Sequence, residues 1–280
     1  MTDINYYFQQ ISNPFLDRFF LLISNLTNEY IYIAIVAFIY YFISRKKGLK
    51  LGLVICSNMM LNVFLKNIFA IDRPYVTDSR VINKDIETGY GYSFPSGHSQ
   101  FNAGFFSALH SCFSLRKYVL PTLLFVLLVA FSRVWLGVHT VLDVTVGLVL
   151  GTVWGAFAFR ILDEIIEKRK FILIVFSLIG IIDFLVFRNH DTFKMLLLYS
   201  GYALGYIFES SFIKYEMPEK LKEKVIGFLI CILGIIIIQI AFSPIENFYI
   251  RSIKYALTGF WATGATPAIM MAGKVKLWKK

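Results

Sequence analysis

The pair of residues with the clearest chemical potential is His139 and Asp143, which lie four positions apart. A helix places side chains with this spacing on the same face. A carboxylate that accepts a hydrogen bond from one imidazole nitrogen leaves the other nitrogen with a free lone pair. Such an imidazole is an oriented nucleophile. The spacing therefore predicts that His139 attacks a substrate and that Asp143 holds its ring.

Three basic residues could surround an anion near this pair. Lys66 and Arg73 are seven positions apart, which corresponds to two helical turns on one face, and Pro74 favours the exit of Arg73 from the helix. Arg133 lies shortly before Gly137 and can offer a planar, two-pronged hydrogen-bond donor. For Lys66 and Arg73 an alternative stays open, because long cationic side chains also reach towards lipid headgroups.

A second imidazole stands in the stretch Pro95-Ser96-Gly97-His98, directly before an apolar run. Proline, serine and glycine favour a tight turn, and the free backbone N–H groups at the start of the following helix attract anions. The Ser96 hydroxyl and the Gly97 N–H would add donors to the same anion. We therefore expect a phosphate-like group to bind here, beside His98.

The composition indicates that these residues are carried by a membrane protein. Hydrophobic residues make up 57% of the 280 residues and charged residues only 16%, less charge than a soluble domain carries. We expect an all-α, polytopic transmembrane bundle whose spans have the length that a bilayer demands. The nine expected spans are residues 27–44, 50–70, 98–114, 118–137, 139–161, 171–188, 192–213, 224–243 and 249–272.

The basic residues predict the orientation of the chain. They cluster after the odd-numbered spans and at the C-terminus, so the positive-inside rule puts the N-terminus outside and the C-terminus in the cytoplasm. All three polar stretches then lie at the outer face, and so does the long connection at 71–97. Because the net charge of +10 is distributed in this way, we do not expect a nucleic-acid partner.

Taken together, the three stretches resemble the signature of the type-2 phosphatidic acid phosphatase family. That signature is a lysine separated by six residues from Arg-Pro, then Pro-Ser-Gly-His, then Ser-Arg, five residues, His, three residues and Asp, and each part is present at residues 66–74, 95–98 and 132–143. The resemblance covers about residues 50–160. Family members usually carry six spans, one more before the first motif than this sequence shows.

The resemblance implies a role for each residue. Lys66, Arg73 and Arg133 would hold the phosphoryl oxygens together with Ser96 and the Gly97 N–H. His139 would attack phosphorus, Asp143 would orient it, and His98 would protonate the leaving oxygen. These roles agree with general chemistry, because phosphoryl transfer spreads negative charge over equatorial oxygens that fixed cations can stabilise. We expect no metal and no other cofactor, although a zinc site at His98, His139 and Asp143 is an alternative.

The family resemblance also divides the chain. We expect an amphipathic surface segment at 1–26, a phosphatase core with five transmembrane spans at 27–162, and a four-span extension at 163–280 that lies outside the resemblance.

Glycines recur every four residues from Gly147 to Gly155 and from Gly201 to Gly205. Small residues with this spacing let helix backbones approach closely.

The expected function is that of a metal-independent phosphatase in a membrane, most simply a bacterial inner membrane. It would hydrolyse a lipid phosphate or diphosphate through a phosphohistidine at the outer face, and its partners would be that substrate and the surrounding lipids. Phosphatidic acid, phosphatidylglycerophosphate and a polyprenyl diphosphate all fit. Two alternatives stay open: a lipid-linked phosphotransferase that uses the same site, and a non-enzymatic lipid transporter with a relict site. A vanadate-dependent haloperoxidase shares the site pattern, but those relatives are soluble.

Overall fold

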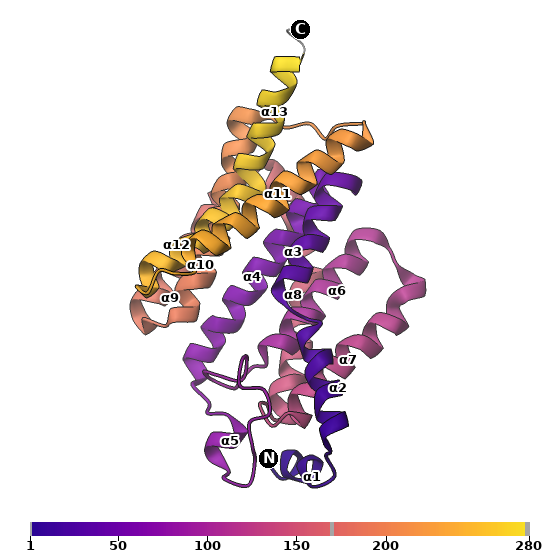
Figure 1. The fold of residues 1–280 in the computed structure, drawn as a ribbon, viewed down its shortest axis with the longest axis vertical. Helices are drawn as coiled ribbons and strands as arrows, with labels where there is room; N and C mark the ends of the chain where they lie inside the picture. The colour runs from indigo at the N-terminus through magenta and orange to yellow at the C-terminus, as the bar shows by residue number, and fades with distance from the viewer. Residues whose placement is uncertain (1, 169–170, 278–280) are drawn as a thin grey trace. The chain divides into compact units, whose positions relative to one another are not determined.

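The computed structural model describes residues 2–168 and 171–277, and the described residues are helical with no strand among them. The expected all-α class is therefore confirmed. The chain forms two compact units, Met1–Tyr32 with Ser57–Arg160 and Ile33–Cys56 with Ile161–Lys280. Each unit is described separately below (Figure 1). The division of the sequence at residue 163 stays a prediction.

The first unit carries all of the predicted site residues. Its elements are α1 (Asp3–Gln10), α2 (Pro14–Asn25), the start of α3 (Glu29–Phe38), the second half of α4 (Arg45–Phe69), α5 (Pro74–Thr77), α6 (Gly97–Phe113), η2 (Arg116–Tyr118), α7 (Val119–Trp135) and most of α8 (Val141–Lys168). Helix α7 contacts α1, α2 and α6. The N-terminal segment is therefore part of the same unit as the predicted site residues.

A small apolar cluster joins the N-terminal helices to the end of α7. Phe20 of α2 packs with Trp135, Leu136 and Val138, and Phe8 of α1 packs against the same group. The start of α2 is fixed locally, because the Asn13 side chain accepts hydrogen bonds from the first backbone N–H groups of the helix, as N-cap residues do. Burial of these aromatic side chains holds the segment in place.

Close contact between α6 and α8 depends on the glycines that recur every four residues. A Cβ atom at Gly151 would lie 2.1 Å from the carbonyl oxygen of Gln100, and one at Gly155 would lie 2.3 Å from that of Gly104. A Cβ at Gly147 would lie 2.7 Å from the carbonyl oxygen of Ser96, the N-cap residue of α6. The close approach predicted from the glycine spacing is therefore confirmed, and it brings the start of α6 against the start of α8.

The second unit contains the C-terminal extension. Its elements are the rest of α3 and α4, η1 (Ile39–Ile43), α9 (Phe171–Phe187), α10 (His190–Phe208), η3 (Glu209–Ile213), α11 (Leu221–Phe242), α12 (Phe248–Phe260), η4 (Trp261–Ala265) and α13 (Thr266–Leu277). Gly201 of α10 lies against α12, where a Cβ would meet the carbonyl of Ala256 at 2.1 Å. Arg45 and the fully buried Glu209 form an ion pair inside this unit.

Five helical stretches of the described residues are long and apolar enough to cross a membrane, judged by length and composition. They are Pro14–Ile43, Arg45–Thr77, Arg116–Trp135, Val141–Ile166 and Leu221–Phe242, and Phe171–Phe187 is a shorter apolar helix. Residues 14–26, predicted to lie at the surface, belong to the first of these stretches. The count of nine spans and the orientation of the chain stay predictions. Four of the basic residues on which the orientation rests lie outside the described residues: Arg169, Lys170, Lys279 and Lys280.

Candidate active site

His139 lies in the short turn that joins α7 to α8. Gly137 has φ of +75°, a conformation that suits glycine, so the helix breaks where the sequence predicted. The carbonyl of Arg133 then accepts hydrogen bonds from the N–H groups of Val138 and His139 at 3.2 and 3.3 Å. This compact turn carries the buried His139 side chain directly in front of α8, the helix that carries Asp143.

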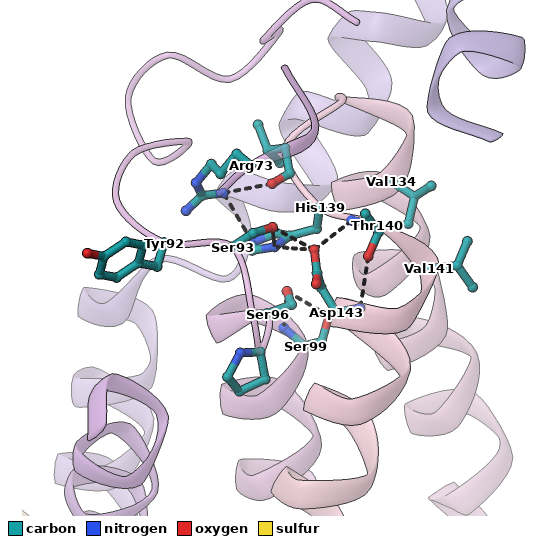
Figure 2. A network of polar contacts seen from close by, with 12 residues as sticks. Arg73, Tyr92, Ser93, Ser96, Ser99, Val134, His139, Thr140, Val141 and Asp143 are labelled. Carbon is teal, nitrogen blue, oxygen red and sulfur yellow. Dashed lines mark hydrogen bonds and ion pairs between the residues drawn. The ribbon is translucent and has the colours of Figure 1, made fainter. Parts of the chain in front are cut away.

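The two nitrogens of the His139 ring have different surroundings (Figure 2). Nδ1 lies 3.6 Å from Oδ2 of Asp143 and 3.3 Å from the hydroxyl of Ser93. Ser93 also donates a hydrogen bond of 2.6 Å to Asp143, and the Thr140 N–H donates one of 2.7 Å. Asp143 is therefore held by two donors while it faces Nδ1. A proton on Nδ1 leaves the lone pair on Nε2.

Arg73 stands on the other side of the ring. Its Nη1 lies 3.3 Å from Nε2 of His139 and donates to the carbonyl of Val138 at 2.9 Å. Its Nε lies within hydrogen-bond distance of the Tyr90 and Gly91 carbonyls at 3.1 and 3.0 Å. The extended backbone of Arg73 before Pro74 agrees with the predicted exit from the helix. A planar cation is thereby placed beside the nitrogen that would attack.

Lys66 approaches the same loop from the last turn of α4. Its ammonium group donates to the carbonyl of Ser93 at 3.2 Å and also contacts that of Tyr92. Lys66 and Arg73 thus both donate hydrogen bonds to backbone carbonyls of the loop segment 90–93, which includes Ser93. The structure brings these two predicted cations to the site, and their hydrogen bonds to loop carbonyls show how the loop is fixed.

The Pro-Ser-Gly-His stretch forms the start of α6, as predicted. Ser96 is the N-cap residue, and its hydroxyl oxygen accepts from the Ser99 N–H at 3.5 Å and the Ser99 hydroxyl at 3.1 Å. The Ser96 N–H donates to the carbonyl of Asp143 at 3.0 Å. Gly97 and His98 occupy the first turn of the helix, and both are half-buried. The start of α6 is therefore tied directly to the helix that carries Asp143.

Arg133 has partners that the sequence did not indicate. Its buried guanidinium group pairs with Asp85 of the loop, and it also contacts Ser24 of α2 and Thr88. Burial opposes ionisation of Asp85, but the charge of Arg133 and the hydrogen bonds from Thr88 and Arg133 hold its pKa below the ordinary value. Asp85 is thus an ionised counterion for one of the predicted phosphate-binding residues.

The surroundings of His139 favour its neutral form. Burial is the main cause that lowers the pKa of His139 well below its ordinary value, followed by the positive charges of Arg73, Lys66 and Arg133. A neutral imidazole is the form that can act as a nucleophile. Among residues 2–168 and 171–277 no cluster of three or more His, Cys, Asp and Glu side chains could hold a metal ion.

Ser93 and Asp85 are the site residues that sequence reasoning missed. Ser93 directly precedes Phe94 and Pro95, close to the predicted anion site. A serine hydroxyl at that place in the sequence was the available signal. Asp85 had no such signal, because it lies in the polar loop where an acidic residue is ordinarily solvated.

Comparison with known proteins places this site in a family. Residues 47–167 match the PAP2 superfamily, and residues 193–277 match the transmembrane extension of PAP2 superfamily phosphatases. The lipid A 4'-phosphatase of Porphyromonas gingivalis is 30% identical over 166 residues, which cover 54% of this chain and 68% of that protein. The chain belongs to the PAP2 superfamily, as its motifs predicted, and its C-terminal half carries the extension found in phosphatases of that superfamily.

A second relative supports the same assignment. The undecaprenyl-diphosphatase BcrC of Bacillus subtilis is 30% identical over 120 residues, which cover 43% of this chain. The match spans 60% of that relative's length. No solved structure matches the chain. With its candidate spans and its match to the transmembrane extension, the protein is an integral membrane protein.

Proposed function

We propose that the protein is a membrane phosphatase that removes phosphate from a lipid phosphate or diphosphate through a phosphohistidine at His139. The observation that carries the proposal is the asymmetry of the His139 ring. Its Nδ1 faces Asp143 and Ser93, whereas its Nε2 faces Arg73. Such an arrangement aims the Nε2 lone pair at the place where the cation would hold a phosphoryl group.

The reaction has two steps. Nε2 of His139 attacks phosphorus, an N–P bond forms, and the P–O bond to the lipid or to its inner phosphate breaks while His98 donates a proton to the leaving oxygen. Burial and the nearby cations lower the pKa of His98, and the negative charge of a bound phosphate opposes this and favours the protonated donor. A water molecule then attacks the phosphohistidine and gives its proton back to His98, and the N–P bond breaks as inorganic phosphate leaves. Asp143 stabilises the imidazole through both steps because it keeps the proton on Nδ1.

The charges near His139 would stabilise the transition state. Phosphoryl transfer develops negative charge on the equatorial oxygens, and fixed donors placed in a water-poor site stabilise such charge strongly. Arg73 and Lys66 would supply cations, and the N–H groups of Gly97 and His98 would supply donors at the start of α6. Arg133 and Ser96 would complete the group of phosphate ligands. The positive charge comes from the chain itself, so the reaction is proposed to need no metal.

The substrate is proposed to be a phosphorylated lipid. Two observations support this. Lys66, Arg133 and Asp143 belong to helices that are apolar enough to cross a membrane, and the two relatives are named for an undecaprenyl diphosphate and a lipid A phosphate. We place the reaction at the outer face of a bacterial inner membrane, because the basic residues predict that orientation.

A phosphate-release panel in detergent with EDTA tests the proposal. Phosphatidic acid, phosphatidylglycerophosphate, a polyprenyl diphosphate and lipid A are offered to wild type, His139→Ala and the control His190→Ala, whose imidazole is exposed in the second unit. We expect EDTA-resistant phosphate release by wild type and the control, and a loss of at least about 1,000-fold in His139→Ala, since removing a nucleophile eliminates the covalent route. A need for added metal, or normal turnover by His139→Ala, would contradict the mechanism. Transfer of the phosphoryl group to a lipid alcohol, with no release of free phosphate, would identify a phosphotransferase.

A further inference from the structure

Asn5 is a fully buried residue in the short helix α1, far along the chain from the catalytic motifs. Its side-chain amide nitrogen donates two hydrogen bonds, one to the carbonyl of Val134 at 2.8 Å and one to the carbonyl of His139 at 2.9 Å. These two carbonyls flank the turn that carries His139. One amide group thus bridges both ends of the turn.

The two carbonyls that Asn5 bonds lie at the end of α7 and in the turn that follows it. The Val134 carbonyl, in the last turn of α7, also accepts a hydrogen bond from the Gly137 N–H at 3.1 Å. Burial of an unpaired carbonyl is unfavourable. Asn5 gives the His139 carbonyl a donor and the Val134 carbonyl a second one, and these bonds fix the backbone of the residue whose side chain reacts.

Other contacts of the N-terminal helices reach the loop between α5 and α6 and the end of α7. The Gln9 amide exchanges two hydrogen bonds with the backbone of Ile82, of 2.7 and 2.9 Å. Asp17 accepts from Lys84 at 2.8 Å and from the indole N–H of Trp135 at 2.9 Å. The same segment is thus bonded both to the α7–α8 turn and to the loop that carries Asp85 and Ser93.

Resting on the proposed function, we infer that Asn5 is a positioning residue for catalysis, which acts through the backbone of His139. A nucleophile must approach phosphorus along a narrow line, and a displacement of about 1 Å can lower the rate on the order of 100-fold. Asn5 restrains the main chain of His139 from one side, while Asp143 and Ser93 restrain its ring from the other. Without Asn5 the turn keeps its bond to α7 but loses its link to α1.

The matching test compares Asn5→Ala and Asn5→Ser with the control Asn25→Ala, whose asparagine is exposed on α2. We expect kcat of Asn5→Ala to fall by about 10- to 100-fold while KM stays within about threefold, because phosphate contacts are unchanged and alignment is lost. Asn5→Ser leaves room for a bridging water and should lose less. The control should keep kcat within about threefold.

Turnover is expressed per folded molecule, measured by size-exclusion chromatography and thermal unfolding in the same detergent. If kcat per folded molecule is normal in both Asn5 variants, or if the substitutions only lower the yield of folded protein, Asn5 is structural and the inference is wrong. His139→Ala is assayed alongside. Its retention of activity would defeat the proposed function itself, whereas an inactive His139→Ala with fully active Asn5 variants would defeat only this inference.

Discussion

Ser93 donates a hydrogen bond of 2.6 Å to Asp143, and its oxygen lies 3.3 Å from Nδ1 of His139. The direct distance from Nδ1 of His139 to the Asp143 carboxylate is longer, at 3.6 Å. The hydroxyl therefore contacts both the proposed nucleophile and the residue proposed to orient it, and the three side chains form one polar group.

The first prediction concerns this hydroxyl. Ser93→Ala removes one of the donors that hold Asp143, so the carboxylate orients His139 less well, and we expect kcat to fall about 10-fold with little change in KM. Asp143→Ala should lose more. A double-mutant cycle measures the coupling, and the two losses should be strongly non-additive because both residues act through His139. Fully additive losses would show that Ser93 acts independently of Asp143.

The second prediction concerns pH. A lowered pKa keeps His139 neutral below the ordinary histidine value of about 6.5, so kcat/KM should persist on the acidic side until the pH falls below the depressed pKa of His139. Lys66→Met removes one of the positive charges that lower this pKa. The fall of kcat/KM on the acidic side of the pH profile, the acid limb, should therefore move to higher pH.

The same substrate is used for both proteins, so that its own ionisation affects each profile equally. Lys194→Met, a basic residue of the second unit, serves as the control and should leave the limb in place. A limb that stays unchanged in Lys66→Met, or moves to lower pH, would contradict the proposed electrostatic link between Lys66 and His139.

The third prediction concerns the buried pair of Asp85 and Arg133. Asp85→Asn leaves a buried guanidinium group without its counterion, and breaking one partner of such a pair destabilises a protein by about 3–5 kcal/mol. We expect a clearly lower unfolding temperature in detergent. Asp3→Asn breaks an exposed pair with Arg80 and should change it little, because water and salt screen exposed ion pairs. Equal unfolding temperatures for Asp85→Asn and wild type would show that Arg133 does not depend on this carboxylate.

The fourth prediction concerns the contact between α6 and α8. Gly151→Ala introduces a Cβ only 2.1 Å from the carbonyl oxygen of Gln100, so the helices must separate and the start of α6 must shift relative to Asp143. We expect lower stability together with lower kcat. Val153→Ala, on the exposed side of the same helix, should affect neither. A Gly151→Ala protein with normal activity and stability would show that α6 can move without disturbing the site.

The sequence was informative wherever a residue's role depends on nearby positions. The four-residue interval from His139 to Asp143, the break at Gly137, the start of α6 at Gly97 and the glycines of α8 are local patterns, and helix geometry converts them directly into positions. Lys66 and Arg73 reach the site for the same reason, because they lie at the end of one helix and just beyond it.

Asn5, Asp85 and the partners of Arg133 could not be predicted in this way. An asparagine or aspartate in an amphipathic or polar segment ordinarily faces water, and only the docking of α1 and α2 on α7 buries Asn5. That docking depends on the packing of Phe8 and Phe20 around Trp135, a long-range contact with no local pattern. For the same reason no local pattern indicates that polar residues of the segment 1–26 bond to the α7–α8 turn and to the loop.

The central claim is that His139 carries the phosphoryl group, and the most direct measurement is to trap it there. Wild type is mixed with a ³²P-labelled lipid substrate, quenched in alkali within milliseconds, digested and sequenced by mass spectrometry. The account predicts an acid-labile, alkali-stable label on Nε2 of His139 that appears and decays at rates compatible with turnover. Label on a different residue, or rapid turnover with no label on His139 at any time, would contradict it.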